Sequence, residues 1–363
     1  MSEKEYLYWL CHIPGLGAVS IRRLYEYFGS FRAIWNAGKN EIAACKVLKA
    51  QQQEAFLENR KKTDDLQREY DGLAARGIRF LAMTDQEYPQ RLRPFHDSPA
   101  GLFVKGRLPE EERPSVAIVG ARGCTEYGRQ LARVFARGLA EEGVQIISGL
   151  ALGIDGAAHD GSLEFSNCSF AVLGCGVDIC YPRENYPLFS RIQESGGLIS
   201  EFLPGSSPQA MNFPMRNRVI SAFSDVVIVI EAREKSGSLI TADLALEQGK
   251  EVFAIPGRLT DPLSAGCNRL IQSGAQAALT PADVLEYLGV QYEKKITISK
   301  KNENRLAKRE KLVYSCLDLR PKHLEEIMEL CGLGITECME CILELELAGL
   351  LYRVGNQYFC KRL

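Results

Sequence analysis

Short apolar runs recur along the middle of the chain, from Ser115 to about Leu288, and helical patterns such as 127–141 and 238–248 separate most of them. The runs are Val116–Val119, Gln145–Ile147, Ala171–Leu173, Leu198–Ile199, Val226–Ile230 and Val252–Ile255. Strands that are apolar throughout and alternate with helices indicate a parallel sheet that is covered on both faces. Because such crossovers are right-handed, the pattern predicts an α/β fold with an extended, Rossmann-like, doubly wound and mostly parallel sheet.

The stretch before this domain carries a helical period instead. Apolar positions follow that period through residues 1–70, with one break at Pro14–Gly17, so we expect a small all-helical N-domain. Residues 71–113 form a connector with two strand candidates, Ile78–Ala82 and Gly101–Lys105.

The Rossmann-like domain, assigned to 114–290, is followed by a basic linker at 291–309 and a last domain at 310–363. The last domain carries three helical patterns and two strand-like pieces. They are 310–317, 322–331, 334–348, Leu350–Val354 and Gln357–Cys360. Three helices and a terminal hairpin, turned by Gly355-Asn356, predict a winged-helix domain.

The composition restricts the class of partner. A hydrophobic content of 46% excludes a disordered chain, which would lack the apolar surface to offset the entropy of ordering. The 363 residues include 46 acidic and 44 basic side chains, for a net charge of -2, and this excludes a wholly basic nucleic-acid wrapper. A polyanion would therefore have to meet a local concentration of positive charge.

The twelve cysteines are expected to be reduced thiols, with no metal bound. Cys338 and Cys341 form a lone CxxC, with Cys331 nearby, whereas a zinc site usually needs a second pair at ligand spacing. Residues 1–10 lack a signal-peptide pattern, and no apolar run approaches the roughly 18 residues of a membrane span. We expect a cytoplasmic protein without a membrane span.

Glycine or a small hydroxyl residue follows nearly every predicted strand. Ligands of doubly wound sheets bind beyond the carboxyl ends of the strands, where small residues let backbone N–H groups and helix N-termini approach an anion. Arg122, Arg216 and Arg218 add full charges on loops at the same face. The combination is typical of a site for several phosphates, carried either by a large nucleotide or by a nucleic-acid backbone.

Two common nucleotide motifs are absent. The glycines after the first strand, Gly120, Gly123 and Gly128, do not have G-x-G-x-x-G spacing, and the chain has no Walker A lysine motif. Binding of a dinucleotide and hydrolysis of ATP therefore lose their best support, and no cofactor is expected.

Three residues near these loops allow two interpretations each. Asp155 and His159, four residues apart on one predicted helix, form either an acid/base couple or a packed pair that orients the loop at Gly149–Gly153; the second is favoured. Phe213, on a predicted loop beside Arg216, is either buried or stacks on an unpaired base.

Several motifs in one order closely resemble the bacterial DNA-processing protein A family (DprA, also called Smf). They are Val119–Arg122 with Tyr127-Gly128, Ser148–Asp155 with His159, Phe213–Arg218, Ser236–Ala242, Phe253–Gly257, and Gly266–Asn268 with Leu270-Ile271. The resemblance covers about 105–290. Ile13–Val19 is similar to the hairpin of the helix-hairpin-helix, SAM-like N-domain that many members carry. One departure is Ala121, where the family usually has serine.

The resemblance implies a non-enzymatic protein that binds single-stranded DNA, dimerises, and helps to load the RecA recombinase during natural transformation. The implied DNA-binding residues are Gly120, Arg122, Ser148, Gly149, Gly153, Phe213, Arg216, Asn217, Arg218, Ser238, Thr241 and Lys250. Leu270 and Ile271 are implied dimer contacts, although ordinary core packing explains them equally well.

Two alternatives remain open. A nucleotide-cleaving enzyme of the lysine-decarboxylase-like phosphoribohydrolase type shares such a domain, but its Pro-Gly-Gly-x-Gly-Thr-x-x-Glu signature is replaced here by Ser236–Ala242. A transcription factor that reads duplex DNA with its winged helix would need a basic recognition helix, whereas 334–348 is acidic and lacks lysine and arginine. We therefore expect the last domain to bind protein or to act in regulation.

Overall fold

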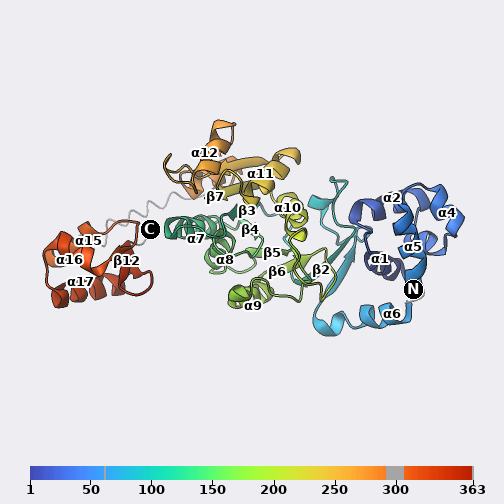
Figure 1. Cartoon of the computed structure of the whole chain (residues 1–363), viewed down its shortest axis with the longest axis horizontal. Helices are drawn as coiled ribbons and strands as arrows, with labels where there is room; N and C mark the ends of the chain where they lie inside the picture. Colours follow the sequence, from blue (N-terminus) through green and yellow to red (C-terminus); the bar gives the residue numbers. More distant parts are fainter. Residues whose placement is uncertain (61–62, 292–305, 362–363) are drawn as a thin grey trace.

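The computed structural model describes residues 1–60, 63–291 and 306–361. A helical unit lies at one end, an α/β body lies in the middle, and a small C-terminal unit lies at the other end (Figure 1). Most of the predicted basic linker, including Lys294, Lys295, Lys300, Lys301 and Arg305, lies outside the described residues.

The body is built on one nine-stranded sheet with the order β1-β2-β6-β5-β4-β3-β7-β8-β9. The strands are β1 (Arg79–Ala82), β2 (Gly101–Gly106), β3 (Ser115–Gly120), β4 (Gln145–Ser148), β5 (Ser169–Leu173), β6 (Gly197–Ser200), β7 (Val226–Ile230), β8 (Glu251–Ala254) and β9 (Gln276–Ala277). The strands from β3 to β9 are parallel, and β1 and β2 add an antiparallel edge. From β3 the chain runs outward to β6 and then crosses to β7, so the strand order reverses between β3 and β7.

Helices cover both faces of this sheet, as the apolar strands require. They are α7 (Glu126–Glu141), α8 (Ile154–Ser162), α9 (Tyr186–Ser195), α10 (Asn212–Phe223), α11 (Gly237–Glu247), α12 (Ala265–Gln272) and α13 (Pro281–Tyr287). α7, α8 and α13 pack over one face around Phe135 and Ile146, and α10 and α11 pack over the other around Phe223 and Val227. The doubly wound, mostly parallel sheet is confirmed.

The N-terminal unit is helical and shares its core with the sheet edge. Its helices are α1 (Glu3–Cys11), α2 (Ala18–Phe28), α3 (Phe31–Asn36), α4 (Lys39–Ala44), α5 (Ala50–Asn59) and α6 (Thr63–Asp71). The Tyr8 ring lies 5.6 Å from that of Phe80 on β1 and 6.1 Å from that of Phe103 on β2. The predicted connector strands therefore exist, and they tie the helical unit to the sheet.

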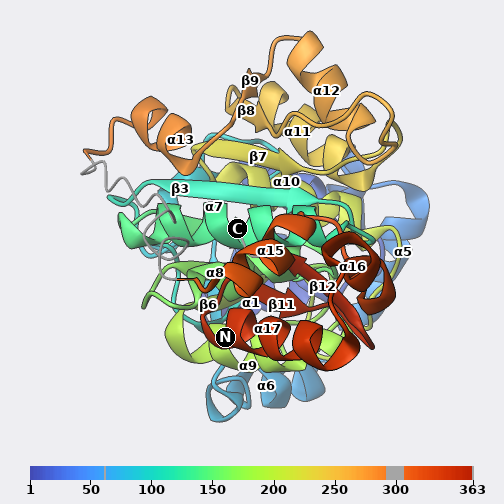
Figure 2. The same ribbon diagram turned by 90° about the vertical axis from the view of Figure 1, so that its left-hand side faces the viewer.

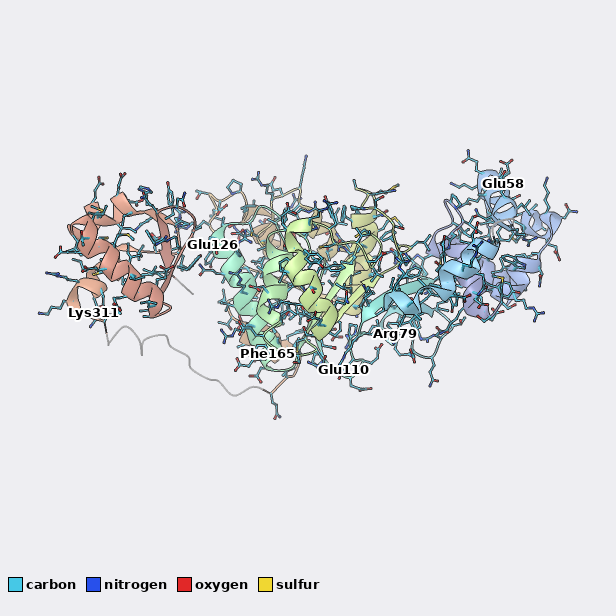
Figure 3. All side chains as sticks on the ribbon, turned by 90° about the horizontal axis from the view of Figure 1, so that it is seen from below. Glu58, Arg79, Glu110, Glu126, Phe165 and Lys311 are labelled. Carbon is cyan, nitrogen blue, oxygen red and sulfur yellow. The ribbon has the colours of Figure 1, made fainter. Side chains whose placement is uncertain are left out.

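The C-terminal unit has the predicted winged-helix form. Its elements are α15 (Lys308–Cys316), β10 (Lys322–His323), α16 (Leu324–Cys331), α17 (Ile335–Leu347), β11 (Leu351–Arg353) and β12 (Tyr358–Lys361). The strands form a sheet with the order β10-β12-β11, in which the short β10 was not predicted. The Gln130 side chain of α7 donates hydrogen bonds to the Tyr352 hydroxyl and, at 3.4 Å, to the Lys361 carbonyl. Glu126 lies at the end of the body that faces this unit (Figure 3).

Two further observations concern the described parts of the chain. All twelve cysteines are free, and no cluster of three or more His, Cys, Asp or Glu side chains in 1–60, 63–291 and 306–361 could hold a metal ion. Within the same ranges, no helix is long and apolar enough to cross a lipid bilayer.

Candidate functional site

A cavity of about 510 Å³ lies beyond the carboxyl ends of the strands, where the strand order reverses. Its walls come from the segments that follow β3, β4, β5 and β7, and from α10. They bring together eight of the predicted residues: Gly120, Arg122, Asp155, Phe213, Arg216, Asn217, Ser238 and Thr241. This is the position at which doubly wound sheets bind ligands.

Arg122 stands over an aromatic ring at this cavity. Its side chain is exposed, and its guanidinium carbon lies 5.1 Å from the centre of the Phe213 ring, a cation–π contact. The Tyr181 ring lies 5.6 Å from the same ring. Among the residues that the structure describes, no carboxylate forms an ion pair with Arg122. The cavity therefore presents one exposed cation next to two aromatic rings.

Arg216 is a buried cation with a different environment. It is 4% exposed, and it donates hydrogen bonds to the carbonyls of Gly149, at 2.7 Å, and Val172. Burial lowers the pKa of its guanidinium to about 10, while Asp155 opposes that shift, so the group stays charged at neutral pH. Its N–H groups hold the backbone carbonyls at the ends of β4 and β5 in place, and its charge adds to the positive potential of the cavity wall.

Asp155 orients the loop before α8. Its Oδ2 accepts hydrogen bonds from the backbone N–H groups of Gly149, at 3.1 Å, and Ala151, at 3.5 Å. Burial raises the pKa of this carboxyl, and the charge of Arg216 opposes the rise. The sequence analysis expected the backbone N–H groups of the β4–α8 loop to bind an anion. In the structure, two of these groups donate to Asp155 instead.

His159 does not pair with Asp155. Its Nδ1 lies 2.9 Å from the Ser169 hydroxyl on β5, and no hydrogen bond joins it to Asp155 in the described structure. Burial lowers the pKa of His159 to about 3, so the imidazole is neutral at physiological pH. The expected pair is thus two separate buried groups, and only Asp155 holds the loop.

The N-terminus of α11 opens onto the same cavity. Ser236 caps the helix, and its hydroxyl lies 2.8 Å from that of Ser238, while Thr241 is buried one turn further on. The first N–H groups of an α-helix have no partners within the helix, and its dipole adds positive partial charge there. A phosphate could meet these groups in the cavity that Arg122 also lines.

Phe213, Arg216 and Arg218 lie on a helix, and the prediction of a loop there is wrong. The segment forms the first half of α10, because a proline such as Pro214 is tolerated in the first turn, where it costs no intrahelical hydrogen bond. Residues two apart point to opposite sides of a helix, about 200° around its axis. Arg218 consequently faces away from the cavity and forms an ion pair with Glu201 at 2.5 Å.

Four other predicted residues shape the scaffold or lie elsewhere. The Ser148 hydroxyl is buried and donates to the Ile118 carbonyl at 2.6 Å. A Cβ atom on Gly149 would overlap the Arg216 guanidinium, and one on Gly153 would overlap backbone oxygens of the β3–α7 loop. Lys250 precedes β8 and is therefore at the amino end of the strands, away from the cavity.

The residues of the cavity wall that sequence reasoning did not assign to the site include Tyr181 and Ser236. The available signals were the position of Tyr181 after a strand and the Ser-Gly-Ser sequence at a helix start. Leu270 and Ile271 on α12 are partly buried against the core, and their role as dimer contacts stays a prediction.

Comparison with known proteins identifies the family to which the chain is similar. Residues 79–289 match the family model of DNA recombination-mediator protein A, and 299–357 match that of the DprA winged helix domain. Protein Smf of Escherichia coli is 39% identical over 287 residues, which cover 77% of this chain and 76% of the relative.

Two solved structures are also similar. DNA processing protein A from Streptococcus pneumoniae has a TM-score of 0.69 and 34% identity, over 80% of this chain and 99% of that one. DNA processing protein A from Helicobacter pylori, solved in a study of its single-stranded DNA binding mode, has a TM-score of 0.53 and 32% identity, over 60% of this chain and 97% of that one. The chain belongs to the DNA-processing protein A (DprA/Smf) family.

Proposed function

We propose that the chain binds single-stranded DNA at the cavity beyond the carboxyl ends of the strands. The observation that carries the proposal is the exposed Arg122 guanidinium, stacked on Phe213 without an ion-pair partner in the described residues. A free cation beside an aromatic face suits a ligand that alternates phosphates and flat bases. The Helicobacter pylori relative, studied for its single-stranded DNA binding mode, supports the same ligand class.

The roles within the cavity follow from the contacts. Arg122 turns toward a phosphate, and an unpaired base takes its place over the Phe213 ring, since every base has a π-face that can stack there. The N-terminus of α11 meets a second phosphate. Arg216 stays on its carbonyl acceptors, and it contributes charge and rigidity.

We infer a wider role from the family. A single-strand mediator that protects incoming DNA and helps to load RecA during natural transformation or recombination fits the description of the matching model as a recombination mediator. In this proposal the protein is a cytoplasmic homodimer that uses Leu270 and Ile271 at its interface, and it performs no catalysis.

Titration of labelled oligo-dT at two salt concentrations tests the DNA proposal. Replacing Arg122→Ala should weaken binding about tenfold, because a charge-assisted hydrogen bond contributes on the order of 1.5–3 kcal/mol. The slope of log K against log salt should fall by about 0.7, the value for one phosphate on a single strand. Arg137→Ala, which removes an exposed arginine from the remote face of α7, should bind as the wild type does. Equal affinity of both variants would show that the strand uses another surface.

The nucleotide-hydrolase alternative gains no support from the family match. Its test is incubation with nucleoside monophosphates, followed by chromatography for free base. Release of base that is lost in Arg122→Ala would replace the DNA-binding proposal with this one.

A further inference from the structure

An apolar stripe runs along the exposed side of α17 in the winged-helix unit. Ile335, Met339, Leu343 and Leu347 follow one another at four-residue spacing, so they share one side of the helix. Ile335 is 59% exposed, Leu343 is 53% exposed and Leu347 is 74% exposed. A groove of about 440 Å³ follows the stripe and ends at Arg353 on β11. Large apolar side chains in a row on a surface mark an interaction site more often than chance exposure does.

Carboxylates line this stripe, and no lysine or arginine interrupts them on α17. Glu340 and Glu346 border the groove, and Glu344 follows one turn after Glu340. None of the three forms an ion pair within the described ranges, whereas Glu337 pairs with Arg309 at 2.9 Å. The apolar stripe therefore has Glu340 and Glu344 along one side and Glu346 near its end, while the cation of Arg353 also lines the groove.

Within residues 1–60, 63–291 and 306–361, no other element covers this side of α17. α17 packs on α15, α16 and β11, and the unit meets the body through Tyr352 and Lys361, on its two longer strands. Figure 2 shows α17 in front of the body, on the side of the chain turned to the viewer. A partner could reach the stripe without displacing any part of the described structure.

We propose that this face of α17 binds a basic, amphipathic helix of a partner protein. The partner's apolar residues fill the groove along Met339 and Leu343, and its lysines or arginines meet Glu340, Glu344 and Glu346, in the helix-in-groove mode. Charge complementarity selects this occupant. Duplex DNA would place phosphates against the carboxylates, and a second copy would place the same acidic edge against itself. The proposal is independent of the single-strand site.

The test uses the full chain and a synthetic 18-residue helix made of leucine and lysine, with all leucines on one face. The control peptide has the same composition, with its leucines spread around the helix. Calorimetry should give saturable binding of the first peptide and at least tenfold weaker binding of the second. Backbone NMR signals of 335–347 and Arg353 should shift in the first titration.

Matched variants distinguish binding at this face of α17 from nonspecific attraction of a cationic peptide to acidic residues elsewhere on the unit. Leu343→Ala and Glu340→Lys should each weaken the amphipathic peptide about tenfold. Leu330→Ala and Glu329→Lys make the same changes on α16, where Leu330 is 55% exposed, and they should leave the affinity unchanged. In all four variants, the backbone NMR signals of the buried winged-helix residues Val313, Ile327 and Phe359 should keep their wild-type positions, which shows that the unit remains folded.

Four results would overturn the proposal. Three of them are equal binding of the two peptides, equal losses in the α16 and α17 variants, and duplex DNA binding that depends on Leu343. Self-association of the free chain that Leu343→Ala abolishes would equally reject it, in favour of a second copy as the occupant.

Discussion

The strand-end cavity and the outer face of α17 both belong to folds that serve nucleic-acid binding, yet they carry opposite charge. The cavity combines the exposed Arg122 with the buried Arg216, and its one lining carboxylate, Asp155, holds loop amides. The α17 face has Glu340 and Glu346 beside apolar side chains, and neither carboxylate forms an ion pair within the part of the chain that the structure describes. A winged helix therefore does not by itself imply DNA contact, because the ligand depends on the side chains that a fold presents.

The two regions also differ in how their helices begin. Gly153 and Gly334 are the N-caps of α8 and α17, but Gly153 has a φ of 78° whereas Gly334 has a φ of -66°. A Cβ on Gly153 would also overlap the Ala121 and Arg122 carbonyl oxygens, while one on Gly334 meets nothing. The loop at the cavity is built by close backbone approach, and the start of α17 is not.

Substitution of Gly153 should have the largest effect on stability among the variants considered, and it tests the difference between the two N-caps. Gly153→Ala should destabilise the body by about 4 kcal/mol, the sum of left-handed strain and a steric clash with backbone. Gly334→Ala should cost less than about 1 kcal/mol, since it loses only a modest preference at an N-cap. Hydrogen-exchange mass spectrometry reports the stability of each region separately. Comparable losses in the two variants would contradict the assigned backbone geometry.

A second prediction separates the two arginines of the cavity. Arg216→Ala should lower the free energy of unfolding by about 3 kcal/mol. The substitution leaves the buried Gly149 and Val172 carbonyls without their hydrogen-bond donor, and it removes the positive charge next to Asp155. Arg122→Ala should change it by less than about 0.5 kcal/mol, as expected for an exposed side chain. Urea denaturation followed by circular dichroism measures both. A stable Arg216→Ala protein that loses DNA binding would instead make Arg216 a direct phosphate ligand.

Much of the body could be predicted because its signals are local. Runs such as Val226–Ile230 are apolar at every position, so they indicate strands without knowledge of the neighbours. The cavity position followed from the general rule that ligands bind at strand ends. Two-residue strands such as β9 and β10 could not be predicted, because they are defined by pairing with a neighbouring strand and have no sequence pattern of their own.

The orientation of single side chains could not be predicted in the same way. Treating 212–218 as a loop allowed Arg216 and Arg218 to share a face, whereas the helix separates them and sends Arg218 to Glu201. His159 lies one helical turn from Asp155, but its partner is Ser169, a contact that only the packing of α8 on β5 creates. Such choices depend on tertiary neighbours that a linear pattern does not contain.

The pH dependence expected from His159 is smaller than the effects of Gly153→Ala and Arg216→Ala, and it gives a last contrast between the two regions. Its pKa is about 3 in the folded state and about 6.5 in the unfolded chain, so the unfolded state binds the proton first as the pH falls. Its contribution to stability is complete above pH 6.5 and declines as the pH falls from there toward 3. The body should lose about 2 kcal/mol between pH 7 and pH 5 from this group. In the winged helix, the sole histidine of 306–361, His323, is partly exposed and makes no such buried contact.

Two measurements check this prediction. NMR of the His159 ring should show a neutral imidazole throughout pH 5–8, and His159→Gln should flatten the dependence of unfolding free energy on pH over that range. The measurement on the wild type does not require the variant to fold. A ring that titrates near pH 6.5 in the folded protein would mean that water reaches the His159 side chain. The predicted loss of stability of the body between pH 7 and pH 5 would then be wrong.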